Sequence, residues 1–428
     1  MSKTDRSRLP TLDDAAGNGL LNRRFFLHSG CAIAGAFTAF SSAAEAAPLA
    51  IPETMKEPGA PVSGYGQPSR FESKVIRTPL SAASLTAIGP GATRTPLQHL
   101  NGMITPNGLF FERIHNGIPD IDPDQHRLLI HGLVKRPQTL SLSALARYPM
   151  TSRIAFVECS GNSAAMYAKE PAAGGVQGIH GLVSCAEWTG VMLSVLLDEA
   201  GVDPKARWLL AEGADAAGMS RSVPLTKALD DAMIALYQNG ERIRPSNGYP
   251  MRLLLPGYEG NMSVKWLRRL KLLEAPVMTK DETSKYSILL KEGRVAQFVY
   301  AMDVKSVITH PSPGLNMTSP GLYEISGLAW SGNGKVARVE VSADGGASWA
   351  DAMLSDPVLS KALTRFRAPW RWSGGPSTLI SRATDDTGAV QPSRAQQIAQ
   401  RGSKGSYHCN VMTCWGVQTS GEVNHVYI

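Results

Sequence analysis

The pattern of apolar residues changes near Tyr300, and this change constrains the fold of the 428-residue chain more than any other feature. Before it, buried-looking strands such as Met251–Leu255 alternate with segments of helical periodicity. After it, short alternating strands such as 323–330 are separated by turn residues. The length allows two hydrophobic cores. We therefore predict an α+β fold, with a mixed α/β domain over residues 81–300 and an immunoglobulin-like β-sandwich over residues 301–428.

One helix of the first domain is predicted from residue spacing alone. Leu225, Leu229, Met233 and Leu236 recur at helical spacing after Pro224, which is a favourable residue for a first helical turn. Such an apolar stripe is typical of a helix face that packs against a core and carries no chemistry.

The first 46 residues have the order of parts expected of an export signal. Arg23-Arg24 precede an apolar stretch, Cys31–Phe40, and a small-residue cleavage pattern at Ala44–Ala46. The apolar stretch is far shorter than the roughly 20 residues that cross a bilayer, so we predict a signal peptide and no membrane span. Its Arg-Arg-x-Phe-Leu form resembles the twin-arginine signals of periplasmic proteins that fold around a cofactor before export. Residues 47–80, rich in Pro, Gly and Ser, are predicted to form an irregular arm.

Charge and cysteine content exclude several classes of protein. The net charge is +7 without any Lys/Arg tract, so we expect no nucleic-acid binding. Five cysteines are too few for a disulfide scaffold, although Cys409 and Cys414 are close enough in sequence to pair in an oxidising compartment. There is no Cys-x-x-Cys-His motif, so any haem must be on another chain.

A single cysteine follows the apolar run Ile154–Val157. Cys159 stands at the predicted end of this strand, before the small turn Ser160–Asn162, where side chains face a cleft. Most single free cysteines are small core residues, and one cysteine without a second ligand beside it is a weak sign of a metal site. The residues alone favour the core.

Two cations occur inside predicted apolar strands, Arg252 in Met251–Leu255 and Lys265 in Val264–Leu267. A buried cation is costly unless it is paired. Either a protein carboxylate or a bound phosphate would pair these two. Arg113 and His115 alternate along another predicted strand, so both point to one side, as they also would on a solvated edge.

Six ordered segments resemble the sulfite oxidase family of molybdopterin enzymes over essentially the whole mature chain. They are FFERIHNGIPDIDPDQHRL, VECSGN, EWTGV, GYPMRLLLPGYEGNMSVKWLRRL, Tyr286 and VEVSADGGASW. Within this family, MTKDETSKYS and NGERIRPSNGYPMRL are most similar to the molybdenum subunit of Sox-type sulfane (sulfite) dehydrogenase. That subunit works with a c-type cytochrome subunit in periplasmic thiosulfate oxidation.

The resemblance implies a molybdenum-molybdopterin cofactor, with no haem or flavin on this chain. It implies that the Cys159 thiolate ligates the metal and that Tyr286 and Arg113 act with it in catalysis. The residues that it assigns to cofactor binding are Arg113, His115, Cys159, Asp215, Asn247, Arg252, Ser263 and Lys265. The implied reaction is oxygen-atom transfer to reduced sulfur, with a c-type cytochrome as electron acceptor.

Departures from the family pattern bear on the substrate. Ser163-Ala164 stand where sulfite oxidases have an arginine, and a second family arginine is missing around Trp415–Val417. A family tryptophan is replaced near Gly178, and a histidine of the pterin contacts is replaced by Asn247. Because a small dianion such as sulfite needs several converging charged donors, we hypothesise a less charged substrate, namely sulfane sulfur on a sulfur-carrier protein.

Two other functions stay open. A direct sulfite:cytochrome c dehydrogenase differs only in substrate, whereas an inactive periplasmic binding or scaffold protein would keep the fold without turnover. The β domain is expected to form the homodimer core of a hetero-oligomer.

Overall fold

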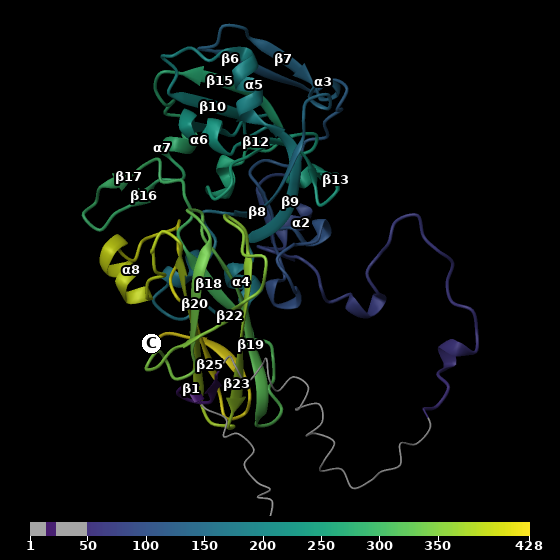
Figure 1. Ribbon diagram of the computed structural model, residues 1–428, viewed down its shortest axis with the longest axis vertical. Helices are drawn as coiled ribbons and strands as arrows, with labels where there is room; N and C mark the ends of the chain where they lie inside the picture. The colour runs from purple at the N-terminus through teal and green to yellow at the C-terminus, as the bar shows by residue number, and fades with distance from the viewer. Residues whose placement is uncertain (1–13, 23–48) are drawn as a thin grey trace, which may run out of the picture.

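The structure, a computed structural model, describes residues 14–22 and 49–428. The predicted twin arginines and the cleavage pattern at 44–46 lie outside the described residues. Figure 1 shows two bodies stacked along the long axis, a mixed one above and a strand-rich one below, with an arm that loops out to one side. Within the described ranges, no helix combines the length and hydropathy needed to cross a membrane.

The upper body is built around two five-stranded sheets. The first has the order β11-β10-β15-β6-β7 and is mixed, because β15 and β6 run parallel whereas the other pairs are antiparallel. Its strands are β6 (Arg127–Gly132), β7 (Gln138–Ser141), β10 (Trp208–Gly213), β11 (Ser220–Pro224) and β15 (Leu267–Leu273). The second has the order β13-β12-β9-β8, with β14 also paired to β12. Its strands are β8 (Thr151–Glu158), β9 (Val183–Met192), β12 (Met233–Gln238), β13 (Glu241–Arg242) and β14 (Arg252–Leu254).

Apolar side chains cover both faces of the second sheet. One face packs with the first sheet, α5 (Leu193–Ala200) and α6 (Leu225–Asp230) in a core that includes Ile234 and Leu236. The other face packs against Phe110 and Phe111. This burial holds the sheet ends that carry the candidate site.

Shorter elements complete the upper body and connect it to the lower one. The strands are β3 (Thr78–Pro79), β4 (Gly91–Arg94), β5 (Glu112–Ile114), β16 (Ile288–Leu289) and β17 (Val295–Ala296). The α-helices are α2 (Ala83–Thr86), α3 (Leu142–Leu145), α4 (Val176–His180), α7 (Lys280–Thr283) and α8 (Arg394–Arg401).

The lower body is a sandwich of two antiparallel sheets. One has the order β1-β2-β23-β19-β18, with β22 also paired to β23, and the other has the order β21-β20-β24-β25-β26. The first contains β1 (Asp14–Ala16), β2 (Leu20–Leu21), β18 (Lys305–His310), β19 (Gly321–Trp330), β22 (Met353–Leu354) and β23 (Thr364–Trp372). The second contains β20 (Val336–Ser342), β21 (Ala350–Asp351), β24 (Ser377–Asp385), β25 (Cys414–Val417) and β26 (Val423–Val426). Trp330, Trp370 and Trp415 are fully buried between the sheets. The predicted α+β class, a mixed domain followed by a β-sandwich, is confirmed.

The predicted helix from Pro224 to Leu236 is wrong in its second half. Helix α6 ends at Asp230, and Met233–Gln238 is strand β12. Because β12 lies inside a sheet buried on both faces, its residues are apolar without alternation, and their spacing matched a helix by coincidence. The strand predicted at Val264–Leu267 also starts later, at Leu267, because Trp266 has a left-handed backbone with φ of 52°.

Buried polar contacts tie the two bodies together beside Cys159. Lys305 of β18 donates to Glu158 Oε1 at 3.1 Å and to Ser163 Oγ at 2.6 Å. The Trp330 indole donates to Glu158 Oε2 at 2.7 Å. The β-sandwich therefore fixes both ends of the turn that carries Cys159.

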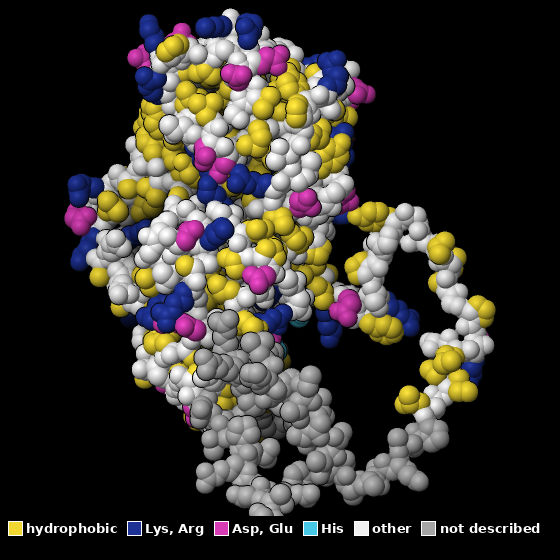
Figure 2. All heavy atoms as spheres, viewed as in Figure 1, with side chains coloured by type: hydrophobic (Ala, Val, Ile, Leu, Met, Phe, Trp, Pro, Cys, Tyr) yellow, Lys and Arg dark blue, Asp and Glu magenta, His cyan; other side chains and the backbone are white. Residues whose placement is uncertain are grey.

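The arm of residues 49–77 contains η1 (Glu53–Met55) and η2 (Arg70–Glu72), each a single 3-10 turn. Figure 2 shows its apolar side chains in solvent along most of this length. The Tyr65 hydroxyl reaches the body and donates to Glu241 Oε2 at 2.9 Å.

Candidate active site

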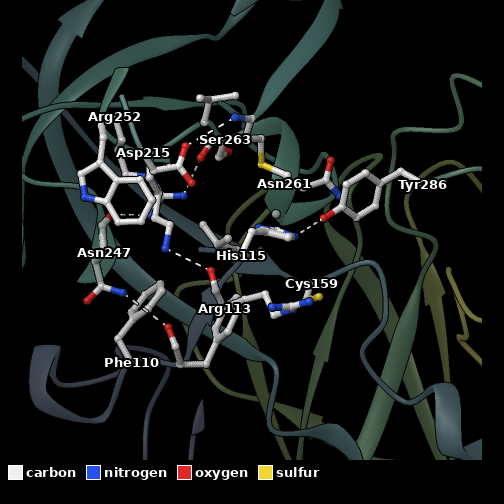
Figure 3. Close-up of a pocket in the computed structure, with 17 residues that line it drawn as sticks. Phe110, Arg113, His115, Cys159, Asp215, Asn247, Arg252, Asn261, Ser263 and Tyr286 are labelled. Atoms are coloured by element: carbon white, nitrogen blue, oxygen red, sulfur yellow. Dashed lines mark hydrogen bonds between the residues drawn. The ribbon is translucent and has the colours of Figure 1, made fainter. Parts of the chain in front are cut away.

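A cavity opens among β5, the end of β8, β14 and the segment before β15 (Figure 3). All nine site residues predicted from the sequence line it, although they come from distant segments. They are Arg113, His115, Cys159, Asp215, Asn247, Arg252, Ser263, Lys265 and Tyr286.

Cys159 follows the last residue of β8 and is held by a tight turn. Its N–H donates to the Leu182 carbonyl at 2.9 Å, and its carbonyl accepts from the Asn162 N–H at 2.8 Å. The side chain is partly exposed in the cavity, whereas Cys185, Cys409 and Cys414 are buried and unpaired. Its position therefore differs from that of a core cysteine.

The Cys159 thiol is not ionised by its protein surroundings. Burial raises its pKa, against the opposing effects of the Gly161 backbone N–H and the Arg113 charge. A metal cation binds the thiolate and displaces the thiol proton. This sulfur is thus suited to a soft metal brought to it and is poorly suited to act as a free nucleophile.

Arg252 is buried and Lys265 is partly buried, and both cations contact backbone carbonyls. Arg252 donates to the carbonyls of Asn247 at 2.9 Å and Ser263 at 2.8 Å, and its Nε has no partner. Lys265 Nζ donates to the carbonyls of Ser246 at 2.8 Å and Arg113 at 3.1 Å. Neither forms an ion pair with a carboxylate in the part of the chain that the structure describes.

Burial shifts both cations toward their neutral forms. It lowers the pKa of Arg252 to about 9 and that of Lys265 to about 7. A buried cation is stable only beside a counter-charge, and among the described residues no carboxylate lies within ion-pair distance of either cation, although Glu112 and Asp215 act on Lys265 from farther away. Of the two explanations that the sequence left open, the contacts favour a bound anion.

The backbone at Asn247–Gly248 brings this anion site together. Gly248 has φ of 115°, and a Cβ there would lie 3.1 Å from the Lys265 Cβ and 3.2 Å from the Arg252 Cβ. Only glycine allows this approach without strain. The buried Asn247 Oδ1 has no hydrogen-bond partner, so it is an acceptor free for a ligand beside the two cations.

Tyr286 and His115 form a neutral pair on another wall of the cavity (Figure 3). The Tyr286 hydroxyl and His115 Nε2 lie 2.7 Å apart. Burial, followed by the Arg113 and Lys265 charges, lowers the pKa of His115 to about 4. Burial also raises the pKa of Tyr286 above its ordinary range. Near neutral pH the pair therefore keeps one hydroxyl proton in place without a net charge.

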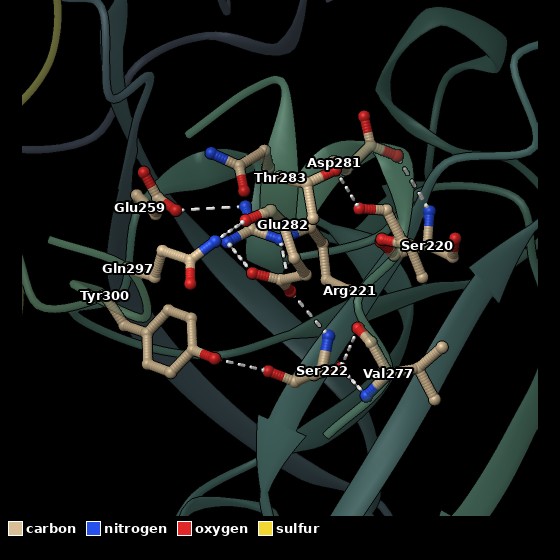
Figure 4. Close-up of polar contacts among 12 residues, drawn as sticks. Ser220, Arg221, Ser222, Glu259, Val277, Asp281, Glu282, Thr283, Gln297 and Tyr300 are labelled. Carbon is tan, nitrogen blue, oxygen red and sulfur yellow. Dashed lines mark hydrogen bonds and ion pairs between the residues drawn. The ribbon is translucent and has the colours of Figure 1, made fainter. Parts of the chain in front are cut away.

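A buried ion network behind Tyr286 was missed by the sequence reasoning (Figure 4). Arg221 donates to Glu282 Oε1 at 2.9 Å and to Glu259 Oε1 at 3.0 Å, and all three side chains are buried. The Arg221 guanidinium carbon lies 4.8 Å from the Tyr286 ring centroid. The only signal in the sequence is a charged residue inside β11. Its partners are 38 and 61 positions away, so spacing gave no indication of the pairs.

The cavity can provide a metal with one protein ligand. In the described ranges, no group of three or more His, Cys, Asp or Glu side chains gathers as a metal site. A metal at Cys159 would therefore take its other ligands from a cofactor. The unpartnered Arg252 Nε, the free Asn247 Oδ1 and the apolar walls of Phe111 and Trp266 fit an anionic ring-containing group, as the molybdopterin interpretation requires.

Comparisons with known proteins agree with this geometry. Residues 115–280 match the model of the oxidoreductase molybdopterin binding domain, and residues 296–413 match that of the Mo-co oxidoreductase dimerisation domain. Sulfite oxidase of Gallus gallus is 31% identical over 319 residues, which cover 69% of this chain and 69% of that protein. Mitochondrial sulfite oxidase of Drosophila melanogaster is 31% identical over 69% of this chain, but the match spans only 56% of that relative.

A solved structure is similar over most of the chain. The crystal structure of the sulfane dehydrogenase SoxCD from Paracoccus pantotrophus matches with a TM-score of 0.85 and 43% sequence identity. The match covers 88% of this chain and 97% of the other.

Proposed function

Because this chain belongs to the sulfite oxidase family of molybdopterin oxidoreductases, we propose that it is the molybdenum subunit of a sulfane dehydrogenase. Family membership makes it a molybdenum-dependent oxidoreductase with molybdenum-molybdopterin as cofactor. The proposed substrate is sulfane sulfur on a carrier protein. The proposed acceptor is a c-type cytochrome on another chain. The 43% identity to SoxCD over nearly all of that chain supports the choice within the family.

The observation that carries the proposal is a pair of cations, without carboxylate partners among the described residues, in the cavity that Cys159 also lines. Arg252 and Lys265 would hold the pterin phosphate, with Asn247 and Ser263 beside it, and Cys159 would be the protein's ligand to molybdenum. An anion next to Lys265 keeps the ammonium charged at neutral pH and so strengthens its own binding. When bound, the cofactor supplies the two-electron oxidation of sulfur with an oxygen atom from water.

Tyr286, His115 and Arg113 would act on the substrate side of the cavity. The Tyr286 hydroxyl is oriented by His115 and can donate a hydrogen bond to an incoming sulfur group. Arg113 lines the same cavity and would stabilise negative charge that develops there. Arg221 packs behind the Tyr286 ring and restricts its position.

A lack of further cations supports a weakly charged substrate. Ser163, where the family has an arginine, is bonded to Lys305 at 2.6 Å and does not line the cavity. The Trp415 indole donates to the Ile308 carbonyl at 2.9 Å inside the β-sandwich. The cationic side chains that line the cavity are Arg113, Arg252 and Lys265. No further cation lines it in place of the two arginines of the family pattern.

Location and assembly belong to the same proposal. The twin-arginine pattern supports export to the periplasm with the cofactor already inserted. The dimerisation-domain match over 296–413 supports a homodimer, to which the cytochrome subunit would add.

The test is a substrate comparison with the molybdenum-loaded protein and oxidised cytochrome c. Carrier-bound sulfane should be turned over faster than free sulfite per molybdenum atom. Equal or faster turnover of sulfite would support the second candidate, a direct sulfite dehydrogenase, which the similarity to sulfite oxidases favours. A molybdenum-free protein without either activity would support the inactive scaffold.

A further inference from the structure

Two strands of the β-sandwich come from the segment before the twin arginines. Strands β1 and β2 pair antiparallel to each other, and Leu20 of β2 pairs with Trp370 of β23. Figure 1 shows them at the far end of the sandwich, in purple. Cleavage at the predicted site after Ala46 would detach this segment, Asp14–Leu21, which we call the docking segment.

The docking segment fills an apolar gap in the domain core. Leu20 is 0% exposed and Leu21 is 4% exposed. Leu20 belongs to the same buried cluster as Trp370, and the partly buried Ala16 packs against that cluster. Burial of these two leucines favours docking, against the entropy that is lost when the segment becomes ordered.

Polar contacts fix the register of the docking segment against both sheets. Asn18 Nδ2 donates to the Ala343 carbonyl and to Ser377 Oγ, each at 2.8 Å. The Asn18 carbonyl accepts from the Trp370 indole at 2.9 Å, and the Gly19 carbonyl accepts from the Arg371 N–H at 2.8 Å. The partners come from β23, β24 and the end of β20, so they are in place only when the sandwich has folded.

Two glycines make the fit specific for the sequence Gly-Asn-Gly. Gly19 has φ of 85°, and a Cβ there would lie 2.1 Å from the Arg371 carbonyl oxygen. A Cβ on Gly17 would lie 2.3 Å from Asp344 Oδ2, and the Gly17 N–H donates to Ser348 Oγ at 2.6 Å. The site therefore accepts a short β-hairpin whose turn has glycine at two positions with asparagine between them, followed by two leucines.

We propose that this end of the β domain is a peptide-binding site whose ligand is the chain's own docking segment. Binding adds a strand to the free part of the β23 edge, a known mode of peptide recognition. Because the docking segment ends two residues before Arg23, its binding couples the predicted export signal to the folded state of the β domain. Removal of the leader would leave the site open.

Hydrogen–deuterium exchange on the unprocessed full chain tests the proposal. The Arg371 amide donates to Gly19 and reports on the docking segment. In the wild type, exchange at Arg371 and at Leu20–Leu21 should be slowed at least about tenfold relative to Leu20→Asp. Ala15→Asp adds the same charge at an exposed position and should exchange like the wild type. Equal exchange in Leu20→Asp and Ala15→Asp would overturn the proposal.

A rescue experiment separates binding from folding. A synthetic peptide of residues 14–22, at millimolar concentration, should restore protection of Arg371 in full-length Leu20→Asp. The same peptide with Asn18→Ala should restore less. If the intact peptide restores nothing while near-ultraviolet circular dichroism shows a folded variant, the proposal is wrong. Neither measurement needs molybdenum, so the outcome is independent of the proposed function.

Discussion

Two groups of cations, one packed against the Tyr286 ring and one lining the cavity, differ in how they are paired. In the network behind the ring, Arg221 donates to the carboxylates of Glu259 and Glu282. In the cavity, Arg252 and Lys265 contact only carbonyls among the described residues, and the Arg252 Nε has no partner. The first network stabilises the fold by itself. The second is complete only with an anion from outside the chain.

The largest expected effect is the loss of activity when Cys159, which lines the same cavity as Arg252 and Lys265, is replaced. Loss of residues that only orient metal ligands costs about 10–100-fold in activity, so Cys159→Ser should lower turnover by more than about 100-fold. Steady-state kinetics per molybdenum atom measure this. Cys185→Ala removes a thiol from the buried core and should keep its activity per molybdenum. Full activity in Cys159→Ser would mean that Cys159 does not bind the catalytic metal.

Breaking the ion network of Arg221, Glu259 and Glu282 should destabilise the protein whether or not the cofactor is bound. Arg221→Met leaves the buried carboxylates of Glu259 and Glu282 without the guanidinium and should cost about 3–5 kcal/mol in the free energy of unfolding. Arg338 has exposed ion pairs, so Arg338→Met should cost less than about 1 kcal/mol. Denaturant titration compares the two. A similar small cost for both would show that Arg221 does not stabilise the fold.

The same substitution at Arg252 in the cavity should affect cofactor retention without lowering the stability of the cofactor-free protein. Arg252→Met removes a buried cation without a carboxylate partner, so the cofactor-free protein should be as stable as the wild type or more stable. Molybdenum content should nevertheless fall, by about tenfold if one charge-assisted phosphate contact of about 1.5 kcal/mol is lost. A strongly destabilised cofactor-free variant would mean that the hydrogen bonds of Arg252 to the Asn247 and Ser263 carbonyls alone offset the cost of burying its charge.

The smallest effect is a pH dependence that the cofactor should suppress. Lys265 has a pKa of about 7 in the folded protein instead of 10.5, so between these values the unfolded chain binds more protons. The stability of the cofactor-free protein should therefore rise with pH from about 7, by at most roughly 1.4 kcal/mol per pH unit from this group. Lys265→Met should remove that part of the slope. An unchanged slope would mean that the pKa of Lys265 is not lowered in the folded protein.

The nine site residues that line the cavity were predicted from the sequence, whereas the buried ion network next to it was not. The resemblance to the sulfite oxidase family identified the nine site residues, whereas the local residue pattern did not, since it favoured a core position for Cys159. The Arg221 pairs join segments up to 61 positions apart and have no local pattern. Met233 and Leu236 matched a helix because both faces of β12 are buried. The β1–β2 segment was assigned to a removable leader because its pairing partner, Trp370, is about 350 residues away.

X-ray absorption at the molybdenum edge tests the central claim most directly, because it counts the sulfur atoms bound to the metal. Wild type and Cys159→Ser should both carry molybdenum, since Arg252 and Lys265 remain to hold the pterin. The variant is predicted to have one sulfur ligand fewer. The same number of sulfur ligands in both proteins would contradict the account.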